Sequence, residues 1–79
     1  MSINAEIEQH ILSAIPDAAV EVSSGSPGHF EIKVTSTAFD GKSPVAKQRL
    51  VLKAISPLMA GAEAPVHAVD KLTTVVPGA

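Results

Sequence analysis

The sequence predicts a small α+β domain in which a three-stranded sheet carries its helices on one face. Two patterns support this prediction. Residues 28–55 combine an alternating strand, a tight polar turn and a basic amphipathic helix, and isoleucines recur every four residues near the N-terminus, which indicates a further helix. With 79 residues, 46% of them hydrophobic, the chain has room for one core and enough apolar side chains to form it.

The first predicted helix is built on Ile3, Ile7, Ile11 and Ile15. Ser2 or Asn4 is expected to cap its N-terminus, and Pro16 is expected to end it. His10 borders the apolar stripe, so we interpret it as a partly exposed helix residue.

Two strands follow as a predicted hairpin. The first covers residues 19–23, with Val20 and Val22 toward the core, and the flexible segment 23–28 connects it to the second. Phe30, Ile32 and Val34 then alternate with polar residues to about position 36, which is typical of a strand with one buried face.

The second helix is expected to begin at Ser43 as N-cap and Pro44 as first helical residue, and to run to about Ile55. Ser56-Pro57 repeats this signature, so a separate short helical turn is predicted over residues 57–60.

The third strand is predicted over residues 66–75. We expect Ala68 and Leu72 on one of its faces and Val69 and Lys71 on the other. Because this strand follows a crossover helix, it can pair in parallel with an earlier strand, which makes the expected sheet mixed.

Several classes of function find no support in these residues. The chain has no cysteine, which excludes disulfides, cysteine nucleophiles and a thiolate metal site of its own. Its glycines match no phosphate-binding loop, and none of its serines lies in a G-x-S-x-G elbow. We therefore expect no enzyme. No apolar run approaches the roughly 20 residues of a membrane span, and no secretory signal is apparent, so a cytoplasmic protein is expected.

The charges are distributed unevenly. The net charge is −2, and the first 31 residues carry five acidic residues without a lysine or arginine. Residues 32–55 reverse this balance with Lys33, Lys42, Lys47, Arg49 and Lys53 against Asp40. The basic segment predicts either a solvated helix surface or a contact with an anionic partner.

Two histidines stand where predicted strands begin. His29 opens the second strand, and His67 follows the loop that ends in Pro65. An imidazole at such a position either caps the backbone through a hydrogen bond or binds a metal. Two imidazoles alone would form an open, weak site, so any metal at His67 would take most of its ligands from elsewhere.

Four motifs occur in a consistent order and spacing: H-F followed by an alternating strand (29–34), S-x-x-F-x-G (36–41), V-x-K-Q-R (45–49) and V-H-A-V (66–69). On these motifs the chain resembles the BolA family, in particular its branch of short IbaG-like bacterial members. The resemblance implies that residues 1–79 form one BolA-like domain with the class II K-homology-like αββααβ fold. Relatives usually continue into a final helix, in place of which this sequence has TVVPGA at 74–79.

The resemblance also implies a function. BolA-like chains pair with monothiol glutaredoxins of the CGFS type, and a 2Fe–2S cluster is shared between the glutaredoxin cysteine, glutathione and the BolA-like chain. His67 matches the family's C-terminal histidine and is the expected ligand. Many relatives carry a second ligand, His or Cys, in the loop that corresponds to 23–28, which has neither here. His29 lies nearby and is a second candidate, although it matches the family's strand-entry histidine. For the isolated chain we expect no cluster, and either a monomer or a weak homodimer.

Some family members are described as DNA-binding transcription regulators, which gives the alternative function. Lys42, Lys47, Arg49 and Lys53 would then contact phosphates. However, the turn Gly41-Lys42-Ser43-Pro44 lacks the second glycine of a GXXG loop, and aromatic side chains that could stack on bases are missing.

Overall fold

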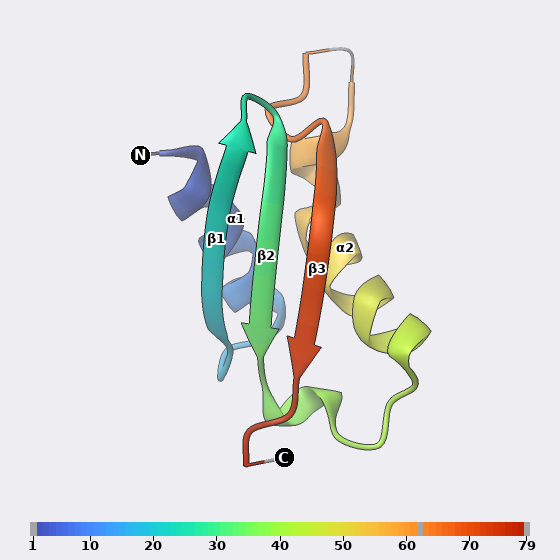
Figure 1. The fold of residues 1–79 in the computed structure, drawn as a ribbon. Coiled ribbons are helices and arrows are strands. Elements are labelled where there is room, and N and C mark those ends of the chain that lie inside the picture. The colour runs from blue at the N-terminus through green and yellow to red at the C-terminus, as the bar shows by residue number, and fades with distance from the viewer. Residues whose placement is uncertain (1, 62, 79) are drawn as a thin grey trace.

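The computed structural model describes residues 2–61 and 63–78. Its elements are α1 (Ile3–Ala14), β1 (Ala19–Ser26), β2 (His29–Thr35), the 3-10 helix η1 (Thr37–Phe39), α2 (Pro44–Met59) and β3 (Ala68–Val75). The sheet has the order β1-β2-β3, with β1 antiparallel and β3 parallel to β2. Both helices cover the same face of the sheet, and the other face is open (Figure 1). The predicted α+β class with a mixed three-stranded sheet is confirmed. No helix of residues 2–61 and 63–78 has the length and apolar character of a membrane span.

Helix α1 begins as predicted. Of the two candidate caps, Ser2 fills the role, since its Oγ accepts a hydrogen bond from the Ala5 N–H at 3.2 Å. Asn4 instead reaches the sheet, where its side-chain amide donates to the Val22 carbonyl at 3.5 Å. The helix ends just before Ile15, whose N–H still bonds the Ile11 carbonyl.

The core lies between the helices and the central strand β2. On this strand Phe30, Ile32 and Val34 are buried while Glu31 and Lys33 are exposed, as the alternation predicted. The remaining fully buried large side chains come from α1 and its C-cap, η1, α2 and the segment before β3: Ile7, Ile11, Ile15, Phe39, Val51, Ile55 and Val66.

Strand β1 is longer than predicted. It extends to Ser26 and leaves only Pro27 and Gly28 as the turn, with an irregularity in register between Ser24 and Ser26. The Ser24 hydroxyl lies 2.9 Å from the Ser26 carbonyl and 3.0 Å from the His29 carbonyl. The Ser24 hydroxyl thus bonds across the turn, and the Ser- and Gly-rich segment continues β1 instead of forming a loop.

The separate helical turn predicted after Ile55 is wrong, because α2 continues through Pro57 to Met59. A proline lacks the N–H that would bond the carbonyl four residues back, which here is that of Lys53. The Ser56 hydroxyl donates to this carbonyl instead, at 3.0 Å. Pro57 also lies in the last turn of α2, so little of the helix follows the missing hydrogen bond.

The predicted faces of β3 are wrong as well. Phe30 pairs with Val69 but the next residue, Glu31, pairs with Lys71, so Asp70 is an extra residue in the ladder. Such a bulge shifts the two-residue alternation by one position. Val69 and Leu72 therefore share the core face, and both pack against the core cluster.

A carboxylate that the sequence analysis did not single out links α1 to η1. Asp17 accepts hydrogen bonds from the Ser36 Oγ (2.6 Å), the Thr37 Oγ1 (2.7 Å) and the Thr37 N–H (3.0 Å). Ser36 is fully buried, and its Oγ also accepts from the Ala38 N–H at 3.0 Å. The hydrogen bonds from Ser36 and then Thr37 lower the pKa of Asp17 from 3.8 to about 2.

Replacing Phe30 with alanine should lower the free energy of unfolding by about 3–5 kcal/mol, because the change leaves a cavity in the core. Urea denaturation measures the loss. Val45→Ala is the matched control: Val45 is 57% exposed, and its truncation should cost about 0.5 kcal/mol or less. A loss for Phe30→Ala no larger than that of the control would contradict the register of β2.

Asp17→Asn should remove a pH-dependent part of the stability. Because the pKa is lower in the folded chain (about 2) than in the unfolded chain (3.8), the ionised carboxylate stabilises the fold above the higher value, and this contribution is lost as the pH falls toward the lower one. The difference in unfolding free energy between the wild type and the variant should therefore be constant at neutral pH and shrink in acid. Urea denaturation at a series of pH values checks this, and a difference that does not change in acid would contradict it.

Candidate functional site

His67 lies directly before β3. The start of β3 lies beside the turn between β1 and β2 (Figure 1). The backbone N–H of His67 donates to the Gly28 carbonyl at 2.8 Å, and the N–H of Ala68 donates to the same oxygen at 3.0 Å. One carbonyl thus fixes the main chain on both sides of the His67 α-carbon. The beginning of β3 is held against the beginning of β2 at this point.

The His67 imidazole lies at the surface, against the α-carbon of Gly28. His67 is an exposed residue, and a Cβ built on Gly28 would overlap the Cδ2 of its ring. Among the described residues, no side-chain hydrogen bond engages this ring; the one imidazole so engaged is that of His29. The expected capping of the strand end by the imidazole is therefore not found at His67, where the hydrogen bond to the Gly28 carbonyl comes from the main-chain N–H.

His29 is held differently. Its Nδ1 lies 3.0 Å from the Oδ1 of Asp70, the bulged residue of β3. A neutral His29 that donates its Nδ1–H to this carboxylate keeps Nε2 as its free lone pair, the arrangement common for histidines that bind metals. The side chains are 45% and 54% exposed, so the pair adds little to stability.

His29 begins β2 and His67 directly precedes β3, but the two histidines do not form a common ligand set. Within residues 2–61 and 63–78, no three His, Cys, Asp or Glu side chains lie together as a metal site would require. His29, Asp70 and His67 therefore do not converge on one ion in this structure. The roles of His67 and His29 as cluster ligands remain predictions.

The four basic residues of the alternative function lie on different sides of α2 and in the loop before it. Arg49 and Lys53 are one turn apart on the exposed side of α2, beside Val45 and Leu52, which are 57% and 37% exposed. Lys47 projects about 200° around the helix from Arg49 and is half-buried, and Lys42 lies in the loop before the helix. Of the four, Arg49 and Lys53 are the two that share this exposed helix face.

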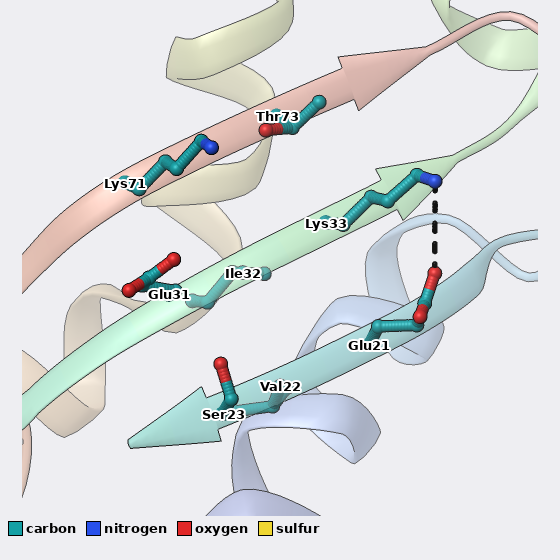
Figure 2. A pocket seen from close by; sticks show the side chains of 8 residues that line it. All are labelled: Glu21, Val22, Ser23, Glu31, Ile32, Lys33, Lys71 and Thr73. Atoms are coloured by element: carbon teal, nitrogen blue, oxygen red, sulfur yellow. Dashed lines mark ion pairs between the residues drawn. The ribbon is translucent and has the colours of Figure 1, made fainter. Parts of the chain in front are cut away.

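The open face of the sheet carries a shallow, charged hollow that the sequence analysis did not identify. Figure 2 shows its acidic and basic side chains on the face opposite the helices, with Lys33 from β2 pointing toward Glu21 of β1. The Lys33 Nζ lies 3.8 Å from the Glu21 Oε2, and both side chains are more than half exposed. The other residues that line the hollow are Val22, Ser23, Glu31, Ile32, Lys71 and Thr73. With two acidic and two basic side chains, the hollow does not select for ligands of one charge.

Comparison with known proteins places this chain in a family. The family model described as BolA-like protein matches residues 2–77. BolA-like protein 1 of Mus musculus is 38% identical over 72 residues, which cover 85% of this chain and 50% of the mouse protein. An uncharacterised protein of the rpoN–murA intergenic region of Acinetobacter guillouiae is 40% identical over 68 residues, covering 85% of this chain and 78% of that protein. The chain thus spans about half the length of the mouse relative.

Solved structures agree with this placement. The solution structure of mouse BolA1 superposes with a TM-score of 0.75 at 30% identity, over 98% of this chain and 67% of the mouse chain. A BolA protein homologue from Coxiella burnetii gives 0.76 at 28% identity, over 98% and 94% of the two chains. The solution structure of yeast Fra2 gives 0.63 at 27% identity, over 92% and 75%. The chain therefore belongs to the BolA-like family.

Proposed function

We propose that this chain is the partner of a monothiol glutaredoxin of the CGFS type, and that His67 is its ligand to a 2Fe–2S cluster shared with the glutaredoxin cysteine and glutathione. The role would be iron–sulfur cluster trafficking or regulation by iron and redox state. The observation that carries the proposal is the exposed imidazole of His67, held at a fixed main chain, in a chain of the BolA-like family.

The donor atoms of this chain fit one corner of such a cluster. The chain has no thiolate, and among its described residues no three ligating side chains lie together. What it offers is a single imidazole nitrogen at the surface, and imidazole is an established ligand of iron in 2Fe–2S centres. The cluster, when bound, would supply exchangeable iron and sulfide and one-electron redox chemistry. Its other ligands would be thiolates of the partner and of glutathione.

The surroundings of His67 favour the approach of a second protein. The residues next to His67 in the chain, Val66 and Ala68, and Gly28, against which its ring lies, carry no charge. A partner can therefore cover them without removing a charge from water, which is the most costly form of desolvation. The backbone hydrogen bonds to Gly28 also mean that little main chain has to be ordered when the partner binds.

Anaerobic titration of the chain into a cluster-loaded monothiol glutaredoxin tests the proposal, with visible circular dichroism as the readout. The wild type should produce a new spectrum that saturates at one-to-one stoichiometry. His67→Ala should lose this spectrum, because the cluster loses a ligand, while the amide spectrum of the isolated variant stays that of a folded chain. His10→Ala is the matched control, since His10 lies on α1 outside this site and its loss should leave the titration unchanged.

Two outcomes would contradict the proposal at different points. If the wild type leaves the glutaredoxin spectrum unchanged, the proposal of a shared cluster is wrong. If His67→Ala reproduces the wild-type spectrum, the cluster is shared but His67 is not its ligand.

A further inference from the structure

We infer that Gly28 is a positioning residue for His67, because the lack of a side chain at Gly28 leaves the space in which the His67 imidazole rests. The claim that this positioning serves cluster binding rests on the proposed function. The packing itself belongs to the isolated chain and can be tested without a partner.

Gly28 contacts both the main chain and the side chain of His67. Its carbonyl oxygen accepts the His67 and Ala68 N–H groups at 2.8 and 3.0 Å, which fixes the main chain. Its α-carbon supports the side chain: a Cβ placed there would overlap the ring at Cδ2 and would lie 3.1 Å from Cγ and 3.2 Å from Cβ of His67. The ring therefore occupies the volume that any other residue at position 28 would fill.

This contact can direct the ligand. With the main chain of His67 fixed, the direction of its ring nitrogens depends on rotation of the side chain, and the surface of Gly28 limits that rotation on one side. An iron held by a second protein has to meet the nitrogen within about half an ångström, so an imidazole restricted in advance binds it more readily. A methyl group at position 28 would push the His67 ring away. Because this side chain is exposed, it can move without unfolding the protein.

Backbone conformation alone does not account for this glycine. Four glycines of the described residues have positive φ: Gly28 (79°), Gly41 (76°), Gly61 (91°) and Gly78 (77°). At the other three, an added Cβ would meet nothing within 4 Å. All four need a left-handed conformation, but only at Gly28 does a side chain rest on the α-carbon. Gly41 is thus a nearly matched control, with almost the same φ and no such contact.

The test compares Gly28→Ala with Gly41→Ala in the full chain. Both substitutions place alanine at a positive φ, so both should lower the melting temperature, and Gly28→Ala should lower it further because its Cβ also meets the His67 side chain. Only Gly28→Ala should shift the His67 ring C–H resonances in the isolated chain, assigned by their loss in His67→Ala. In the heterodimer, only Gly28→Ala should change the visible circular dichroism, and the shared cluster should be lost to a chelator about tenfold faster than with Gly41→Ala.

A second variant keeps the test decisive if Gly28→Ala does not fold. Asparagine tolerates positive φ better than alanine but also carries a Cβ, so Gly28→Asn keeps the clash with the ring and reduces the backbone strain. It should shift the same His67 resonances and weaken the cluster in the same way.

Each failure identifies a different error. Unchanged His67 ring resonances in both Gly28 variants would overturn the packing contact. Shifted resonances with an unchanged heterodimer spectrum and chelation rate would overturn the positioning role. A wild type that forms no shared cluster would overturn the proposed function and the positioning role together, while the ring resonances would still decide the contact.

Discussion

The hydrogen bonds to the Gly28 carbonyl anchor the parallel pairing of β3 with β2, on which the rest of the structure depends. This oxygen receives two N–H groups at the point where β3 begins, about 40 residues along the chain from the turn that carries it. A parallel pair cannot be closed by a tight turn, so the chain crosses over through η1 and α2 before it returns. The crossover also brings Phe39, Val51 and Ile55 over the apolar face of β2, where they complete the core with the isoleucines of α1. The same junction places His67 at the surface.

The sequence was sufficient for the elements that local patterns determine. The isoleucine repeat of α1, the alternation of β2 and the Ser43-Pro44 start of α2 each act within a few residues, and each is found where it was predicted. A local side-chain hydrogen bond that lets a helix continue through a proline was harder to predict. The Ser56 hydroxyl takes over the Lys53 carbonyl that Pro57 leaves without a partner, so a residue that normally stops a helix is accommodated near the end of α2.

Long-range contacts were not predictable from one sequence. The bulge at Asp70 depends on how β3 meets β2, and the contact of this carboxylate with His29 joins residues 41 positions apart. Asp17 finds Ser36 and Thr37 nearly 20 residues away, at a distance where no sequence pattern connects them. For the site, the position of His67 where the third predicted strand begins made it one of two possible metal ligands, and its assignment as the cluster ligand came from the family's V-H-A motif. Gly28 looked like an ordinary turn glycine, because the ring that rests on it belongs to a residue 39 positions later.

The central claim is that a nitrogen of this chain is bonded to the iron of a shared cluster. The most direct measurement is pulsed electron paramagnetic resonance of the reduced heterodimer, prepared with this chain labelled with ¹⁵N-histidine and with an unlabelled glutaredoxin. The account predicts a strong ¹⁵N hyperfine coupling in the wild type that disappears in His67→Ala. Absence of this coupling in the wild type would contradict the claim that the chain ligates iron, and a coupling that persists in His67→Ala would assign the bond to another histidine.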